Sequence, residues 1–423
     1  ALLVVLCAIL AAFGFKGRAT IVGIDLGTTY SVIGVNENDV VRIIPDQRGN
    51  HLIPSMVSFL ATGEIKIGID SSKLKTDIPH VTIYEAKRII GRSFETDLQI
   101  SKESENRPFK LVRSPQKNDQ SQAWYDISHL SNQPSYVSPR RIGSLVLGEL
   151  LSIAKHNLGH SQIRSAVVAV PAKFDQNQKA ETVNAFKDAG LTVQRILEEP
   201  TAAALAYGLH NRPDVNYVLV YDIGGGTLDV SLLFISEKNV QVIATDGDDE
   251  LGGGDFDRKM MEVIFSKLGP RLLRENIAYE IPEKCGFKEN ICGVSSLKDT
   301  SVQAKHDLSL SEETIATCRY NKIDAQKWSE SCADWTLAEI KISKGEFEDA
   351  SSGLFLRALN SVDRLLESSG LSAEEIDEVV MVGGSSRIPK IREDLKKRLN
   401  VSQLNTSIDP DITVAYGVAT VAH

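Results

Sequence analysis

The chain has 423 residues, 42% of them hydrophobic and 24% charged, and this length predicts two or more domains with a sizeable buried core. The composition is that of a folded globular protein, which excludes collagen-like, coiled-coil and disordered chains. The 47 basic and 56 acidic side chains give a net charge of −9, so no field gathers phosphate backbones and no nucleic-acid partner is expected.

The N-terminal stretch is apolar without interruption over residues 1–15, and Lys16 and Arg18 follow at once. It is short for a membrane-spanning helix, which needs about 20 residues, and suits the apolar region of a secretory signal. A buried first strand is the alternative, but another strand begins nearby at Ile21. We therefore predict a signal peptide or short anchor at residues 1–18, with membrane contact only through this segment.

Strands and helices alternate after this segment, which predicts an α/β protein with mixed sheets. Residues 275–338 give no comparable pattern, although they hold four of the five cysteines. The expected elements, in chain order, are strands at residues 19–25 and 31–35 joined at Gly27, a helix at 142–158 ended by Gly159, a strand at 165–171, a helix at 175–188 closed by Gly190, a strand at 191–197, and a helix from Pro200 to Leu209.

One pattern occurs twice. IVGIDLGTTYSVIGV and YVLVYDIGGGTLDVSLL each contain an apolar strand, an Asp, a turn of small residues with a hydroxyl, and a second strand. Two unrelated tight hairpins are the alternative. The shared position of Asp25 and Asp222 at the strand ends favours two similar lobes that face each other across a cleft.

The two turns suit phosphate chemistry. Residues 27–29 and 224–227 supply glycines, which let a backbone approach an anion closely, and hydroxyl groups. Neither turn is a Walker loop, because GxxxxGK[ST] does not occur. Asp25 and Asp222 could hold Mg²⁺ through its water shell. Together the turns predict a nucleotide between two lobes.

Two further charged residues have simpler interpretations from the pattern alone. Glu199 precedes Pro200 at a helix start, where the helix dipole favours a carboxylate, so capping explains it. Lys87 would face solvent on an amphipathic helix, as most lysines do. Sequence pattern alone therefore leaves both residues without a catalytic role.

Other candidates are weaker. His156 and His160 stand one helical turn apart but lack an HExxH partner, so a metal role is disfavoured. The basic run at residues 396–398 is interpreted as a solvated face. The cysteines, Cys7, Cys285, Cys292, Cys318 and Cys332, show no metal-ligand spacing; an oxidised pair is an open alternative if the signal is real.

Seven motifs resemble those of the seventy-kilodalton heat-shock chaperones, in the actin, hexokinase and heat-shock ATPase superfamily. They are GIDLGTTYS at residues 23–31, YEAKRIIGR at 84–92, VVAVPAKF at 167–174, EEPTAAALAYGL at 198–209, DIGGGTLDVS at 222–231, LGGGDFD at 251–257 and VVMVGGSSRIPKI at 379–391. The resemblance implies an actin-like ATPase fold with two ribonuclease-H-like lobes around a nucleotide cleft. The implied ranges are lobe I at 19–208, lobe II at 209–400, and a return segment to lobe I at 401–423.

The resemblance also implies roles for single residues, with ATP or ADP, Mg²⁺ and K⁺ as cofactors. Lys87 would position the attacking water at the γ-phosphate. The other implied catalytic residues are Glu199, Asp25, Asp222 and Asp229; Asp25, Glu199 and Asp222 would hold Mg²⁺ largely through water. The implied nucleotide-binding residues are Gly27, Thr28, Thr29, Tyr30, Gly224, Gly225, Gly226, Thr227, Lys305, Ser309, Gly383, Gly384, Ser385, Arg387 and Asp411.

The sequence departs from the family pattern at a few positions. The usual Glu and second basic residue of the ribose-contacting helix fall at Val302 and His306, and Gly254 replaces an acidic or amide residue. The family's linker and peptide-binding domain are not expected, because the sequence ends at His423. This resembles the microsomal ATPase-core branch of the family, and implies a location in the endoplasmic reticulum lumen or microsomes, or secretion.

We therefore expect an ATP-hydrolysing, chaperone-like core that is slow and acts through J-domain proteins or nucleotide-exchange factors. Three alternatives stay open: a non-catalytic nucleotide-binding scaffold, a small-molecule kinase of the same superfamily, and a luminal chaperone whose peptide-binding domain lies beyond His423.

Overall fold

The computed structural model describes residues 19–94, 100, 107–116, 122–268, 294–321 and 335–423. The signal or anchor predicted at residues 1–18 lies outside the described residues, as do Cys7, Cys285, Cys292 and Cys332. Among the helices that the structure describes, none has the length and hydropathy needed to cross a bilayer.

The chain divides into two compact units. The first comprises the described parts of residues 1–220, 232–245 and 405–423, and the second comprises those of residues 221–231 and 246–404. The boundary between these ranges passes along three consecutive strands, β13 (Tyr217–Ile223), β14 (Leu228–Ser236) and β15 (Asn239–Asp248).

The first unit is built on a mixed sheet with the order β12-β11-β1-β2-β3, and β4 pairs with β2. β1 is parallel to β11 and antiparallel to β2, as expected for buried strands joined by a hairpin and by a crossover helix. The strands are β1 (Ile21–Leu26), β2 (Tyr30–Glu37), β3 (Val40–Ile43), β4 (Ile53–Pro54), β11 (Ser165–Val170) and β12 (Thr192–Glu198).

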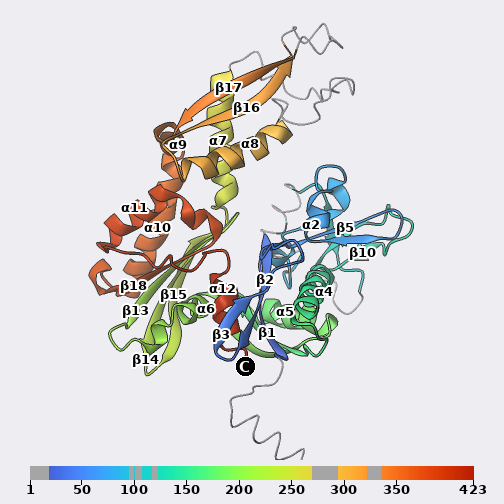
Figure 1. Ribbon diagram of the computed structural model, residues 1–423, viewed down its shortest axis with the longest axis horizontal. Helices are drawn as coiled ribbons and strands as arrows, with labels where there is room; N and C mark the ends of the chain where they lie inside the picture. Colours follow the sequence, from blue (N-terminus) through green and yellow to red (C-terminus); the bar gives the residue numbers. More distant parts are fainter. Residues whose placement is uncertain (1–18, 95–99, 101–106, 117–121, 269–293, 322–334) are drawn as a thin grey trace, which may run out of the picture. The chain divides into compact units, whose positions relative to one another are not determined.

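Helices cover both faces of this sheet (Figure 1). α4 (Pro139–Leu158) contacts β2 and α5 (Gln176–Asp188) contacts β12, while α6 (Glu199–Ala206) and α12 (Thr413–Thr420) pack on the other face. The core between sheet and helices is aliphatic, with residues such as Ile24, Leu147 and Val168 fully buried.

α6 and α12 approach each other at backbone distance. A Cβ atom on Gly417 of α12 would lie 1.8 Å from the carbonyl oxygen of Ala202 on α6, so only glycine fits. Tyr207, just after α6, accepts from the Ile408 amide at 3.2 Å through its hydroxyl. The segment before and within α12 is thereby fixed to the first unit.

Smaller elements extend the first unit beside α4. Two three-stranded sheets have the orders β6-β5-β7 and β10-β9-β8. Their strands are β5 (Met56–Phe59), β6 (Ile65–Ile67), β7 (Thr82–Tyr84), β8 (Lys110–Arg113), β9 (Ala123–Asp126) and β10 (Tyr136–Val137); the short helices are α2 (Ile69–Ser72) and the 3₁₀ turns η1 (Pro79–Val81), η2 (Ala86–Arg88) and η3 (Leu209–Asn211).

A second sheet repeats the strand order of the first. Its sheet runs β15-β14-β13-β18, which corresponds in order to β3-β2-β1-β11. The internal repeat seen in the sequence is therefore a repeat of topology. The remaining elements here are β18 (Glu378–Val382), α10 (Ser352–Ser369), α11 (Pro389–Leu399), η6 (Ala373–Glu375) and η7 (Gly384–Arg387).

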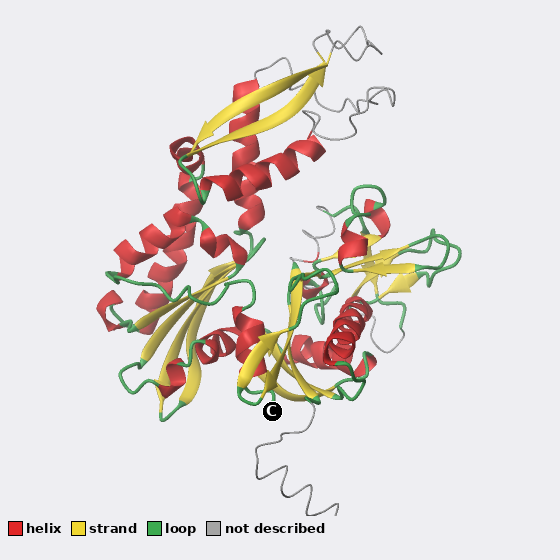
Figure 2. Cartoon of the chain, in the orientation of Figure 1, coloured by secondary structure: helices red, strands yellow, loops and turns green. Residues whose placement is uncertain are grey.

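A hairpin of β16 (Glu313–Asn321) and β17 (Trp335–Ser343) packs on three helices, and Figure 2 shows its two long strands beside them. These helices are α7 (Gly253–Leu268), α8 (Val294–Leu308) and α9 (Lys344–Ala350). Ordered structure therefore occupies part of the range 275–338, for which no pattern could be recognised in the sequence.

The alternation of strands and helices predicted from sequence is confirmed, with shifted ends. The helix predicted from residue 142 begins at Pro139, because Ser138 caps it by accepting from the Arg141 amide at 3.1 Å. Gly159 ends it in a left-handed conformation, as predicted. The helix predicted to reach Leu209 ends at Ala206, since Gly208 adopts a positive φ of 66°.

Candidate functional site

The turn at residues 27–29 joins β1 to β2. Asp25 pairs with Val32 of β2 and Ala169 of β11, which places it near the carboxyl end of a central strand. In sheets with parallel strands this end is where ligands bind. Thr29 and Tyr30 are exposed, while Gly27 and Thr28 are half-buried.

Ser55 braces this turn and was not predicted from sequence. Its hydroxyl donates to the carbonyl oxygen of Gly27 at 2.8 Å, and its amide donates to that of Thr29 at 2.9 Å. Ser55 follows β4, whose pairing with β2 brings it to the turn. No local signal in the sequence marks it, because its role depends on that long-range pairing.

Lys87 does not lie on an amphipathic helix and does not face solvent, so that interpretation is wrong. It lies in η2, the 3₁₀ turn that begins directly after Glu85. Glu85 has a φ of 57°, in the left-handed region. Glu85 forms ion pairs with Arg88, at 3.0 Å, and with Arg107. Such a conformation is uncommon outside glycine and turns the chain so that Lys87 enters the unit.

The Lys87 ammonium lies 2.5 Å from Glu199 Oε1 and 3.8 Å from Asp25 Oδ1. The side chains of Lys87, Asp25 and Glu199 are only 11%, 17% and 16% exposed. Three residues that the family resemblance linked are thus brought together by β1, η2 and α6. One cation is shared between two carboxylates.

Burial is the main influence on both acids. It raises the pKa of Asp25, although the Lys87 charge opposes the rise. It also raises the pKa of Glu199, again against Lys87 and with a further rise from the Asp25 charge. Both carboxylates are therefore poorly solvated and short of positive charge, as in sites that bind a cation.

Glu199 is not a helix cap, which corrects the simpler interpretation of this residue. The N-cap of α6 is Glu198, which makes no side-chain cap hydrogen bond, and Glu199 is the first helical residue. Pro200 follows in the first turn, as predicted. The carboxylate of Glu199 instead reaches Lys87, which the spacing along the chain does not reveal.

In the second unit, the turn at residues 224–227 lies against the start of α7. The Gly224 carbonyl accepts from the Gly253 amide at 3.0 Å, and the Gly225 carbonyl accepts from the Gly254 amide at 2.8 Å. A Cβ atom on Gly252 would lie 2.3 Å from the amide nitrogen of Gly226. This close fit places the positive end of a helix dipole beside a glycine turn, an arrangement that favours anions.

The segment after β18 also contacts the turn at residues 224–227. The Ser385 hydroxyl donates to the Gly224 carbonyl at 2.8 Å. Gly383 has a φ of 78°, and a Cβ atom there would lie 2.7 Å from Asp222 Oδ1. The predicted nucleotide-binding residues Gly383 and Ser385 are therefore adjacent to Asp222 and to the turn that follows it.

Lys305 on α8 is almost fully buried and is tied to the first turns of α7. Its ammonium lies 2.7 Å from Asp257 Oδ1 and donates to the Gly253 carbonyl at 3.3 Å. Ser309 donates back to the Lys305 carbonyl at 3.2 Å. Asp257, which sequence reasoning missed as a partner, thus positions the lysine implied to contact ribose.

The other predicted site residues are placed as follows. Asp229 lies half-buried on β14, Gly226, Thr227 and Gly384 are half-buried, and Arg387 is exposed at the end of η7. Asp411 belongs to the first unit, and its amide donates to Asp409 Oδ1 at 3.0 Å. Of the positions that depart from the family pattern, Val302 is half-buried and His306 is exposed.

Within the described ranges, no group of three or more His, Cys, Asp or Glu side chains is arranged to hold a metal ion. His156 lies on α4, whereas His160 lies beyond the helix and accepts from the Gln162 amide at 3.3 Å. The basic run at 396–398 is exposed on α11, as predicted, and Arg398 pairs with Asp363.

Each unit therefore contains a glycine turn whose carbonyls are held from behind and an acidic residue at the preceding strand end. The first unit adds a buried lysine with two carboxylates, and the second adds a helix N-terminus and a buried lysine. A comparison with protein families matches residues 21–423 to the family described as Hsp70 protein. The matched range includes every predicted site residue.

Proposed function

Because the chain belongs to the Hsp70 family, whose members are ATPases, we propose that it binds and slowly hydrolyses ATP as a chaperone-like core of the secretory pathway. The observation that carries this proposal is the Lys87 ammonium held between Asp25 and Glu199. A fixed cation beside acids at a strand end is suited to stabilising the charge of phosphoryl transfer.

In the proposed mechanism, Lys87 orients the attacking water and neutralises charge at the γ-phosphate. Glu199 and Asp25 hold the ammonium in place, because each offers a buried carboxylate on a rigid element. The backbones at residues 27–29 and 224–227 bind the phosphates. Positioning, rather than covalent chemistry, supplies the rate.

The acids fit Mg²⁺ as the associated ion. Asp25 Oδ1 is buried and has no hydrogen-bond partner among the described residues, so it is free to accept from a metal-bound water. Asp25, Glu199 and Asp222 would hold the ion largely through its waters, since hard oxygen ligands suit it. When bound, Mg²⁺ neutralises charge on the phosphate oxygens.

The direct test is turnover of radiolabelled ATP by the wild-type protein and by Lys87→Ala. Hydrolysis above background that is lost in the variant supports the proposal. Equal background rates in both would contradict catalysis. Calorimetric ATP binding in that case would select the second candidate, a nucleotide-binding scaffold, which the departures at Gly254, Val302 and His306 favour.

The secretory location has its own support. Cys318 is disulfide-bonded, and disulfides persist in oxidising compartments. Two N-x-S/T triplets begin at Asn400 and Asn405; Asn400 is exposed at the end of α11. Sensitivity of the cellular protein to endoglycosidase H, lost in Asn400→Gln or Asn405→Gln, would support a luminal location. Exclusive recovery in cytosolic fractions would contradict it.

The partners we propose are J-domain proteins and nucleotide-exchange factors, which members of the family generally use. They would read the nucleotide state of the core. Within the family we propose that the chain is related to the microsomal ATPase-core branch. Sequencing the transcript beyond His423 tests this placement, because an in-frame peptide-binding domain would contradict it.

A further inference from the structure

The first unit contains a cavity of about 490 Å³ that shares no lining residue with the site described above. Its walls come from the loop Pro45–Arg48, from β4, from β6 and α2, and from one face of α4. This volume lies in the range of small-molecule pockets, which is about 300–1,000 Å³.

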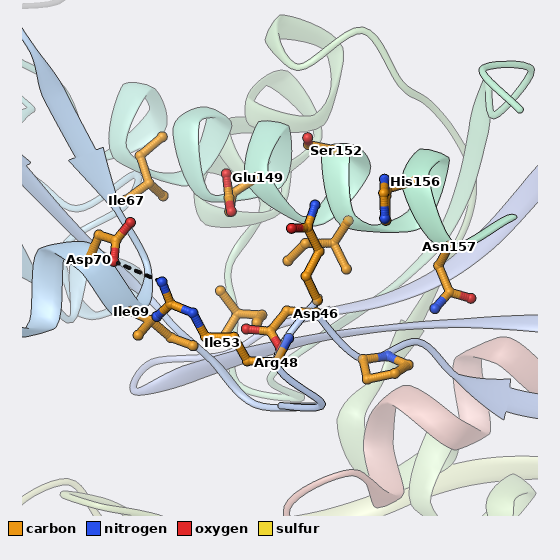
Figure 3. Close-up of a pocket in the computed structure, with 13 residues that line it drawn as sticks. Asp46, Arg48, Ile53, Ile67, Ile69, Asp70, Glu149, Ser152, His156 and Asn157 are labelled. Carbon is orange, nitrogen blue, oxygen red and sulfur yellow. Dashed lines mark hydrogen bonds and ion pairs between the residues drawn. The ribbon is translucent and has the colours of Figure 1, made fainter. Parts of the chain in front are cut away.

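α4 contributes a complete stripe of side chains to the cavity. Glu149, Ser152, Ile153, His156 and Asn157 recur at helical spacing and therefore share one face. Figure 3 shows Glu149 and His156 projecting from the helix towards the loop that carries Asp46 and Arg48.

Most polar groups in the cavity already have partners. Asp46 accepts from the amides of Arg48 and Asn50, each at 2.8 Å. Asp70 lies 3.1 Å from the Lys73 ammonium and 3.7 Å from the Arg48 guanidinium, a contact drawn in Figure 3. Asn157 accepts from Arg42 at 2.7 Å.

Glu149 differs from these groups. It is half-buried on α4, and its carboxylate makes no hydrogen bond or ion pair with any residue that the structure describes. Burial raises the pKa of its carboxyl, and the charges of Asp70 and Asp46 raise it further. The cavity therefore contains a carboxylate that lacks a counter-charge and faces two other acids.

The remaining wall is apolar. Ile53, Ile67, Ile69 and Ile153 line the cavity; Ile53 is buried and the other three are partly exposed. A ligand that fits these walls needs a positive charge at Glu149 and an aliphatic stem along the isoleucines. Among the described lining residues, Arg48 is the one side chain with a permanent positive charge, and it is paired with Asp70.

We propose that this cavity binds a small aliphatic primary amine, with its ammonium on Glu149 and its alkyl stem against the four isoleucines. The group that this cavity would recognise is an alkylammonium, and the side chain of a lysine carries the same group. The proposal does not depend on ATP hydrolysis, because none of the cavity residues belongs to the site built on Lys87.

Binding can be measured from the NMR signals of the isoleucine methyl groups that line the cavity. n-Pentylamine is titrated into the full chain labelled with ¹³C at the Ile δ1 methyl groups, at constant ionic strength. We expect saturable shifts at Ile53, Ile67, Ile69 and Ile153. Pentan-1-ol, which has the stem without the charge, should shift them far less. Shifts that never saturate, or equal shifts with the alcohol, would overturn the proposal.

Variants locate the charge. Glu149→Gln should weaken binding by about fivefold, the upper range for loss of one partly exposed ion pair. Glu374→Gln, which removes an exposed carboxylate in the second unit, is the matched control and should leave affinity unchanged. Glu149→Lys, which carries its own ammonium stem, should abolish binding. Unchanged affinity in both Glu149 variants, with native methyl spectra, would contradict the assignment.

A second probe distinguishes a free amine from the lysine side chain of a partner protein as the ligand. Nα-acetyl-lysine methylamide carries the same ammonium and stem on a peptide backbone. Weaker binding than n-pentylamine supports a free amine as the ligand. Tighter binding of the lysine derivative would overturn that source in favour of a lysine side chain from a partner protein.

Discussion

Lys87 and Glu199 form an ion pair of 2.5 Å although they are 112 positions apart in the chain. The lysine comes from a 3₁₀ turn and the acid from the first turn of α6. Their contact, with Asp25 at 3.8 Å, defines the chemical centre of the first unit.

Lys87→Ala should lower the rate of ATP hydrolysis by about 100-fold or more, the usual cost of removing one electrostatic group from such a site. ADP affinity should change much less, because the glycine turns remain. Single-turnover hydrolysis and calorimetry measure the two effects. Lys110→Ala, at a side chain that is 72% exposed, is the matched control; an equal loss there would contradict a specific role.

Asp25→Asn should raise thermal stability near neutral pH. Because burial raises the pKa of Asp25, the folded state binds a proton at this carboxyl more tightly than the unfolded chain does. The free energy of unfolding therefore falls as pH rises from the ordinary pKa through the raised one. Removing this charge should increase the melting temperature by about 2–4 °C, equivalent to about 1 kcal/mol.

Glu346→Gln is the control of opposite sign for that experiment. Hydrogen bonds from Lys267 and Ser343 lower the pKa of Glu346 to about 2. Its stabilising contribution is present above the unfolded pKa and is lost as pH falls towards about 2. This variant should therefore lower the melting temperature near neutral pH. A decrease with Asp25→Asn would show that its charge is well compensated.

Gly417→Ala should destabilise the first unit. The added Cβ would lie 1.8 Å from the Ala202 carbonyl oxygen, so α12 must move away from α6. Overpacking of this kind costs about 1–3 kcal/mol, and more when backbone must shift. Gly353→Ala on α10 is the matched control, since nothing lies within 4 Å of its Cβ. It should stabilise by about 0.5–1 kcal/mol.

Lys305→Met should destabilise the second unit by about 3 kcal/mol, because it leaves Asp257 buried without its ammonium partner. The double variant Lys305→Met, Asp257→Leu should recover most of that loss. Denaturant unfolding measures both. If Lys305 also contacts ribose, ADP affinity stays low in the double variant; full recovery of affinity would limit Lys305 to a structural role.

The local elements could be predicted from the sequence because their signals are local. The strand β11 is a continuous apolar run, and α5 begins with a capping box between Asp175 and Gln178. β16 could not be found in this way. Its buried face carries Thr314 and the small residues Ala316 and Cys318, while the large Ile315 is 59% exposed, so the strand shows no clear hydrophobic alternation.

The sequence by itself determined the family, the two repeated hairpins and the residue types of the site, because motif order and glycine spacing are properties of the chain. Only the tertiary structure decided which of those residues meet. Lys87 is buried against Glu199 instead of facing solvent. Ser55 donates a hydrogen bond to the first turn, and Asp257 forms an ion pair with Lys305. Each contact joins different elements of the chain, and it is strengthened by burial in a medium of low dielectric constant. A local sequence pattern records neither the partner nor the burial, so it could not predict these contacts.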